Sequence, residues 1–312
     1  SLLDEYLHSR ADSAGYMSLP DITAGEQAAL PPDSDTREDL LAFYFELRYF
    51  LSIYEVLDDK YIIYGDYDSA GAFHLHLQCM DPSGCLDSYL KRGRCAVFFS
   101  ATLLPVNYYR EQLAGREDDY AIYAPSPFHS SHRLLMIAKD VSTKYTRRTP
   151  VEYRRITDYI LRFIQAKIGN YLVFFPSYRM LTDIREYIEA SVYCQESVDI
   201  YVQESSMSEQ AREEFLSHFQ DTPSKTTIGL CVMGGIFGEG IDLKDSRLIG
   251  AVIVGTGLPM VCTQNELFRN YFDEKKGTGF NYAYRYPGMN KVLQAAGRVI
   301  RTDSDRGAIL LL

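Results

Sequence analysis

Residues 294–301, QAAGRVIR, combine one amide and two guanidinium groups in a short stretch. In a helix, Gln294, Arg298 and Arg301 occupy positions i, i+4 and i+7, which lie on one face. Gly297 lies on that face too, and without a side chain it lets another surface approach closely. Two arginine forks and an amide suit a polyanion, most simply a nucleotide phosphate. The alternative interpretation is a solvated basic helix face.

Three loops upstream follow apolar runs that we expect to be strands. Residues 174–179, FFPSYR, place Ser177 where it can cap a helix whose free N–H groups hold a phosphate. Residues 231–242 bring glycines that allow close backbone approach, followed by Glu239 and Asp242, and residues 255–259 form a third loop. Ligands of open α/β sheets bind at the carboxyl ends of strands, so these loops should line one rim. For Asp242 the alternative is a capping carboxylate.

The elements that position these loops follow a strand–helix alternation. Apolar, β-rich runs occur at residues 120–123, 134–138, 171–175, 198–202, 227–232, 248–254 and 308–312. Amphipathic helices are expected at about 151–168, 178–190, 208–220, 260–273 and 288–301. Continuous apolar strands with helical crossovers indicate a parallel sheet covered by helices on both faces. The predicted fold class is α/β.

The first hundred residues have a different texture. A helix is expected to start at residues 35–38 and to carry an apolar stripe to about Leu57, which we interpret as a packing arm. Strands are predicted at 61–64 and 73–77, followed by a short helix at 82–90 and a strand at 95–99. His74 and His76 alternate on one strand, which is more typical of a polar sheet face than of a metal site.

Charge and missing motifs narrow the function classes. The chain carries a net charge of −10, of which residues 1–60 hold 13 acids and 4 bases, leaving 29 acids and 28 bases elsewhere. Such a balance is compatible with a groove for a single strand. No G-x-x-x-x-G-K-[ST] or G-x-G-x-x-G motif occurs, so the main cradle for a triphosphate must come from elsewhere and a nicotinamide enzyme is disfavoured. Six cysteines without a C-x-x-C pair predict neither disulfide nor metal site.

Taken together, these motifs resemble those of the XPD/DinG-like branch of superfamily 2 DNA helicases. Residues 100–103 resemble motif III, 174–179 motif IV, 234–243 motif V and 294–307 motif VI, and the resemblance covers about residues 45–312. That family couples ATP hydrolysis to 5′→3′ translocation on single-stranded DNA through two RecA-like motor domains. The first motor domain contains a helical arch and, where present, an iron–sulfur cluster.

The resemblance implies a domain organisation. Residues 1–58 resemble the end of the arch domain, 59–104 the tail of the first motor domain, and 105–312 the second RecA-like domain. The phosphate loop, the acidic box and any 4Fe–4S ligands would precede residue 1, so this chain is expected to be a C-terminal fragment that is inactive alone. ATP and Mg²⁺ would bind only with the missing N-terminal motor domain. The other expected partner is single-stranded or forked DNA, and the expected state is a monomer in the bacterial cytosol, without a membrane segment.

The resemblance also implies roles for individual residues. Arg301 is expected to be an arginine finger, Arg298 a second phosphate or structural contact, and Gln294 a sensor of the γ-phosphate or of the attacking water. Nucleotide state is expected to be linked to DNA grip by Glu239, Gly240 and Asp242, and coupling is expected of Ser100, Ala101 and Thr102. The candidates for contacts to the DNA backbone are Ser177, Arg179, Gln203, Gly235 and Thr256.

Two further clusters are candidates for contacts to a nucleic-acid strand. Tyr284, with Tyr282 and Tyr286, lies in a predicted loop and could stack on bases, the alternative being a surface tyrosine cluster. Residues 275–276 and 147–148 are better explained as solvated loop charges. For the whole chain, two other functions stay open: a non-catalytic RecA-like module that binds nucleic acid or protein, and part of an RNA helicase.

Overall fold

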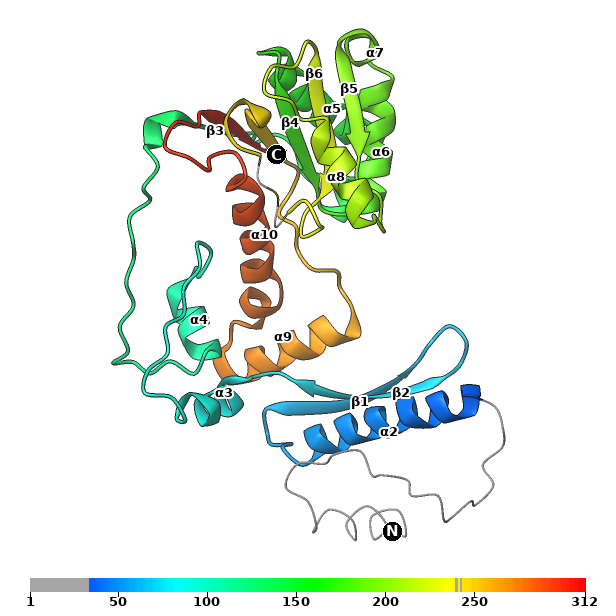
Figure 1. The fold of residues 1–312 in the computed structure, drawn as a ribbon, viewed down its shortest axis with the longest axis vertical. Helices are drawn as coiled ribbons and strands as arrows, with labels where there is room; N and C mark the ends of the chain where they lie inside the picture. Colours follow the sequence, from blue (N-terminus) through cyan, green and yellow to red (C-terminus); the bar gives the residue numbers. More distant parts are fainter. Residues whose placement is uncertain (1–33, 239–240, 242) are drawn as a thin grey trace. The chain divides into compact units, whose positions relative to one another are not determined.

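A six-stranded parallel sheet is the main feature of the structure, a computed structural model that describes residues 34–238, 241 and 243–312 (Figure 1). The strand order is β3-β8-β7-β4-β6-β5. In the central register, Val173 of β4 lies between Leu230 of β6 and Val252 of β7. The strands are β3 (Arg133–Ile137), β4 (Asn170–Phe175), β5 (Val198–Val202), β6 (Thr226–Val232), β7 (Gly250–Ile253) and β8 (Gly307–Leu311).

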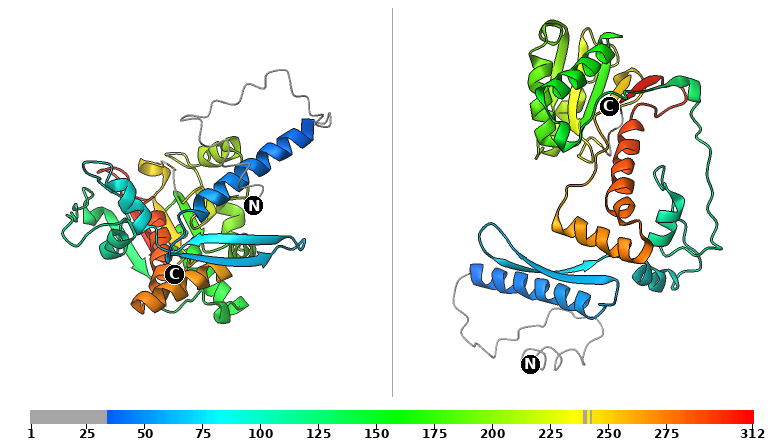
Figure 2. Two further views of the ribbon diagram at one scale, coloured as in Figure 1. Left: turned by 90° about the horizontal axis from the view of Figure 1, so that it is seen from below. Right: turned by 180° about the vertical axis from the view of Figure 1, so that it is seen from behind.

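Helices cover both faces of this sheet, as predicted (Figures 1 and 2). On one face, α5 (Pro150–Gln165), α6 (Tyr178–Glu189) and α7 (Val192–Ser197) share a core with the strands. On the other face, α8 (Glu209–Ser217) and α10 (Tyr286–Ala296) form a second core. Phe174 and Phe175 are both fully buried, one in each core, which is why the strand has an unbroken apolar sequence.

Short polar residues fix where the helices begin. Thr149 accepts a hydrogen bond from the backbone N–H of Glu152 at the start of α5, and Pro150 occupies the first turn. Ser177 caps α6 and Ser208 caps α8 in the same way. These caps set the point at which each strand-to-helix loop ends.

A third core joins residues 60–112 to the segment between β7 and β8. Its buried members are Met80, Tyr271, Phe272 and Tyr282, with Tyr108 packed against them. The elements involved or nearby are the antiparallel hairpin β1 (Tyr61–Tyr67) and β2 (Phe73–Cys79), α3 (Ser83–Leu90), α4 (Val106–Gln112), α9 (Thr263–Lys276) and a π-helix, η5 (Asn281–Arg285). Short 3-10 turns are η2 (Ser130–His132), η3 (Tyr145–Arg147) and η4 (Asp245–Arg247).

The chain divides into two units, residues 1–59 and 60–312. In the first unit, the structure describes the helix α2 (Ser34–Tyr54), which confirms the predicted helix. None of the described helices combines the length and the apolar run that a membrane span requires.

Two predicted strands are absent from the described structure. Residues 95–99 and 120–123 have no strand conformation, and Phe99 and Tyr120 are 89% and 99% exposed. An apolar run becomes a strand only when a neighbouring strand supplies hydrogen-bond partners, and no described strand pairs with either segment. Apolar composition alone therefore misled these two predictions.

Candidate functional site

The predicted rim lies at the carboxyl ends of β4, β6 and β7, where three loops leave the same edge of the parallel sheet. The loop after β4 carries Ser177, which accepts a hydrogen bond from the N–H of Met180 at 3.3 Å and caps α6. Arg179 follows in the first turn of α6 and is exposed. These two candidates therefore lie at the rim.

Gln203 is an internal clamp between two of the rim loops. Only 3% of the residue is exposed. Its side-chain oxygen accepts from the N–H of Val232 at 3.0 Å, and its amide nitrogen donates to the hydroxyl of Tyr178 at 2.9 Å. A Cβ on Gly235 would lie 2.5 Å from that nitrogen, so a glycine is needed for this approach. Burial and these bonds argue for a positioning role of Gln203 instead of the predicted contact to DNA.

The glycine loop after β6 folds back on itself. Gly234 has φ +73°, a conformation that favours glycine, and the N–H of Gly238 donates to the carbonyl of Gly235 at 2.8 Å. A Cβ on Gly234 would meet the side chain of Lys291 on α10 at 3.1 Å. The predicted nucleotide contacts Glu239, Gly240 and Asp242 lie outside the described residues.

The loop after β7 exposes Thr256 between Gly255 (φ +77°) and Gly257 (φ +57°). A Cβ on Gly255 would lie 2.4 Å from the hydroxyl oxygen of Thr143. A segment that precedes α5 thus packs against this loop and belongs to the rim.

The two arginines of residues 294–301 converge on the glycine loop. Arg298 donates from Nε to the carbonyl of Gly238 at 3.1 Å and from Nη1 to the carbonyl of Ile241 at 3.3 Å. Arg301 donates from Nη2 to that same carbonyl of Ile241 at 2.6 Å. Nε of Arg301 is buried and has no hydrogen-bond acceptor among the described residues. Gln294 lies on α10, half-buried, one turn before Arg298.

The route by which these arginines meet differs from the prediction. A helix to residue 301 was expected, but α10 ends at Ala296 with Gly297 as its C-cap, so the arginines follow the helix. Asp305 explains the break, because its carboxylate accepts from the backbone N–H groups of Arg301 and Thr302 at 2.6 and 2.8 Å. The prediction that Gln294, Arg298 and Arg301 share one helical face is therefore wrong. The two guanidinium groups nevertheless converge on one carbonyl.

Asp305 is a residue that the sequence interpretation missed. Its carboxylate also accepts from the N–H of Asp245 at 3.0 Å, and the residue is 3% exposed. Burial raises the pKa of the Asp305 carboxyl, but the hydrogen bonds from Arg301, Thr302 and Asp245 outweigh it and leave the pKa below its ordinary value. The signal available in the sequence was an aspartate in a short polar turn, where carboxylates often bind backbone N–H groups.

A second missed feature is the loop at residues 142–149. Buried Glu152 accepts from the N–H of Ser142 and, at 3.0 Å, from the guanidinium of Arg147. Tyr145 is 79% exposed, and the guanidinium carbon of Arg148 lies 5.8 Å from the centre of its ring. Because Thr143 of this loop contacts Gly255, the loop offers an exposed aromatic ring and a cation at the rim. The capping pattern of residues 149–152 could have indicated an ordered loop here.

Other candidates lie away from this arrangement. Tyr284 is 3% exposed and donates to Glu266 at 2.6 Å, so its ring has no free face for a base, and the alternative of a surface cluster is wrong as well. Burial and the adjacent Glu266 carboxylate raise the pKa of Tyr284 to about 12. Ser100, Ala101 and Thr102 form a turn in which Thr102 N–H donates to the Ser100 hydroxyl at 3.2 Å. Ser100 and Ala101 are exposed.

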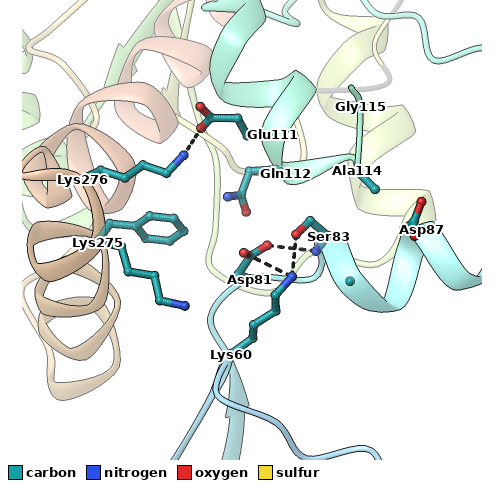
Figure 3. Close-up of a pocket in the computed structure, with 12 residues that line it drawn as sticks. Lys60, Asp81, Ser83, Asp87, Glu111, Gln112, Ala114, Gly115, Lys275 and Lys276 are labelled. Atoms are coloured by element: carbon teal, nitrogen blue, oxygen red, sulfur yellow. Dashed lines mark hydrogen bonds and ion pairs between the residues drawn. The ribbon is translucent and has the colours of Figure 1, made fainter. Parts of the chain in front are cut away.

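A cavity of about 440 Å³ lies between α3, the end of α4 and the end of α9 (Figure 3). Lys60 lies 2.9 Å from the hydroxyl of Ser83 and 3.6 Å from Asp81, and Lys276 pairs with Glu111. The charges predicted to be solvated at residue 276 thus bind within the protein. No three His, Cys, Asp or Glu side chains converge as a metal site requires, within the described part of the chain.

Comparisons with known proteins agree with this geometry. The family model described as a helicase C-terminal domain matches residues 160–312. The chain is 29% identical over 187 residues to the ATP-dependent DNA helicase XPD of Sulfolobus acidocaldarius, covering 56% of this chain and 30% of that protein. It is 32% identical over 157 residues to a regulator of telomere elongation helicase 1 homolog of Anopheles gambiae, covering 46% of this chain and 16% of that protein. The chain spans less than a third of the length of these curated relatives.

Solved structures show the same fold. An XPD structure in the apo form superimposes with a TM-score of 0.62 at 21% identity, covering 89% of this chain and 54% of that one. A second XPD helicase structure gives a TM-score of 0.60 at 21% identity, covering 84% of this chain and 45% of that one. These similarities confirm the RecA-like α/β fold.

Proposed function

We propose that this chain, whose residues 160–312 match a helicase C-terminal domain and which is similar to an XPD helicase, supplies the second motor domain of an ATP-dependent helicase of the XPD/DinG-like branch of superfamily 2 that moves along single-stranded DNA. In this proposal residues 105–312 form that motor domain, residues 59–104 continue from the first one, and residues 1–58 end an arch domain. The direction 5′→3′ is part of the proposal and rests on the resemblance of the motifs.

The convergence of Arg298 and Arg301 on the glycine loop carries the proposal. Both guanidinium groups donate to the carbonyl of Ile241, so the charge of each is held beside the glycine loop. A buried Nε on Arg301 without an acceptor among the described residues is costly, and an anionic ligand would satisfy it. This chemistry fits a nucleotide phosphate.

ATP with Mg²⁺ supplies a transferable phosphoryl group when bound between the two motor domains. Arg301 would stabilise charge on that group, and Arg298 would hold the loop that Arg301 contacts. Gln294 would orient a water molecule. Glu239, Gly240 and Asp242 are proposed nucleotide contacts on the resemblance alone, because they lie outside the described residues.

The proposed path of the strand follows the exposed part of the rim. Arg179 and Thr256 are exposed and Ser177 is half-buried, so these residues can contact phosphates without reading the bases. Tyr145 and Arg148 add a ring for stacking and a cation, which the buried Tyr284 cannot provide. Residues 100–102 are proposed to couple nucleotide state to movement through a partner surface.

The test compares this chain with the protein that also carries the first motor domain. The chain alone should bind an oligodeoxynucleotide with affinity that falls steeply with salt and should not hydrolyse ATP. The longer protein should hydrolyse ATP, with stimulation by single-stranded DNA greater than by RNA of the same sequence. Stimulation by RNA alone would assign an RNA helicase. Binding without any hydrolysis by the longer protein would leave only a binding module.

A further inference from the structure

An apolar groove of about 870 Å³ lies beside β3, one of the two edge strands of the six-stranded sheet. Leu134 and Met136 of β3 and Leu310 of β8 contribute apolar side chains, and Phe163 of α5 and Ala166, the C-cap that follows this helix, line the groove as well. Leu134 is 57% exposed, although it lies among apolar neighbours. Apolar surface of this kind in a hollow is typical of a docking site.

The width of the uncovered surface matches one helix. Strands lie about 4.8 Å apart and a helix with its side chains is about 10 Å wide, so one helix covers about two strands. On this face α5 and α6 pack against the central strands in one core. Among the described residues, α5 is the only α-helix that lines the groove over β3 and β8. A further helix would complete the layer.

The charges around the groove identify the chemistry of its occupant. Four of its lining side chains are cations, namely Lys139, Arg162, Lys167 and Arg306, and none of the described lining residues is an acid. This contrasts with the whole chain, in which 42 acids outnumber 32 lysines and arginines. An apolar floor inside a basic rim is complementary to a helix with one apolar face and acidic residues beside it.

Nucleic acid fits this groove less well than a helix does. Binding of a single strand combines basic side chains with exposed aromatic faces for stacking, yet Phe163 and Tyr171 in this groove are only 8% and 3% exposed. Tyr159 donates its hydroxyl to Asp140 at 2.7 Å. The groove also lies beside the carboxyl-terminal half of α5, whereas the rim loop at residues 142–149 precedes the helix. None of the lining residues is among the proposed nucleotide or DNA contacts, and Arg306 directly follows Asp305, which binds the backbone of Arg301.

We infer that this groove docks an acidic amphipathic helix of a partner protein. The probe is a dye-labelled peptide of about 20 residues, with leucines on one face and glutamates on the other, and binding is measured by fluorescence anisotropy. The protein should bind this peptide and should bind a lysine-bearing counterpart at least about tenfold more weakly. Leu134→Glu and the double variant Arg162→Glu/Lys167→Glu should each weaken binding by about tenfold or more.

Arg154→Glu is the matched control, because Arg154 is exposed on the same helix but does not line the groove. It should leave peptide affinity unchanged, and Leu134→Glu should leave oligodeoxynucleotide affinity unchanged, which separates this inference from the proposed function. Equal affinity for the two peptides, no peptide binding, or insensitivity to Leu134→Glu would overturn the inference. A photo-crosslinker at position 134 should label an acidic helical segment of another polypeptide, and labelling of nucleic acid or of the same chain would overturn it too.

Discussion

Two motif-like stretches of this chain differ in how the protein holds them. At the arginine corner, formed by Gly238, Ile241 and residues 298–305, two guanidinium groups and one carboxylate each bind backbone groups of neighbouring loops. Residues 95–104 are different, since Phe99 is 89% exposed and the hydrogen bonds of Ser100 and Thr102 stay within the turn. Contacts within its own domain therefore fix the geometry of the arginine corner, whereas no such contacts among the described residues fix the turn at residues 100–102.

Of these two stretches, only the arginine corner therefore has side-chain directions that are defined by contacts within this chain. Held side chains have defined directions, so the buried Nε of Arg301, for which the described residues supply no acceptor, points to one specific position for an acceptor. An exposed turn has no such direction until another surface packs on it.

The largest effect should follow from removing the guanidinium of Arg301. In the protein that carries both motor domains, Arg301→Ala should lower the ATPase rate by about 10³–10⁵, the range for a lost arginine finger. Stability should change little, because Asp305 binds the backbone N–H of this residue and keeps that partner. Arg301→Lys keeps the charge but loses the fork and should stay impaired. A variant that retains more than a tenth of the wild-type rate would contradict the assignment.

Removing Asp305 should have the next largest effect, on stability. Asp305→Ala leaves three backbone N–H groups without their charged acceptor and should lower the free energy of unfolding by about 3 kcal/mol, measured by urea denaturation. Asp303→Ala, an exposed residue in the same loop, is the control and should change it by less than about 0.5 kcal/mol. Equal effects of the two substitutions would show that the corner is not held as described.

The pH dependence of this difference follows from the lowered pKa of Asp305. A folded-state pKa below the unfolded one stabilises the protein fully above the unfolded pKa, which for an aspartate is ordinarily about 3.8, and the effect is lost as pH falls through the folded pKa. The gap between wild type and Asp305→Ala should therefore be constant near neutral pH and shrink only below about pH 4.

The sequence predicts the secondary structure of a segment correctly where that segment is buried within its own domain. The strands at 171–175 and 227–232 were predictable, because burial on both faces requires an unbroken apolar run. The run at 95–99 has the same composition but no described partner strand, and composition cannot show that. The sequence spacing predicted that Arg298 and Arg301 lie together on one face of a helix. The helix ends before them, because Asp305 binds the backbone N–H of Arg301. The two guanidinium groups still converge, because both bind backbone carbonyls of the glycine loop.

The sequence also does not show which tyrosine rings are exposed to solvent. Tyr284 was a candidate for stacking, yet it is buried against Glu266, whereas Tyr145 is 79% exposed beside the rim. Both lie in stretches that the sequence predicts to be loops. Which ring faces solvent is decided by long-range contacts, such as the bond of Glu152 to Ser142, that a single sequence does not display.

Tyr145 is exposed, but its loop is fixed by the bonds of Glu152 to Ser142 and Arg147, so we expect its ring to be positioned for stacking on a base. Tyr145→Ala should weaken binding of an oligodeoxynucleotide by about tenfold at constant salt, because one base–aromatic stack is worth about 1–3 kcal/mol. Tyr145→Phe keeps the ring and should bind normally. Tyr120→Ala removes a ring that is 99% exposed elsewhere and should have no effect. Equal losses for the substitutions at 120 and 145 would remove the loop at 142–149 from the proposed path.

The smallest effect should come from the exposed turn. Ser100→Ala removes a hydroxyl whose bonds are local and exposed, so the free energy of unfolding of this chain should change by less than about 0.5 kcal/mol. Amides of residues 97–102 should also exchange with solvent much faster than the amides of Arg301 and Thr302, which Asp305 binds. In the protein with both motor domains the same amides should become protected, and Ser100→Ala should then uncouple ATP hydrolysis from DNA. Slow exchange in the chain alone would instead show that the turn is held without a partner surface, and the contrast with the arginine corner would disappear.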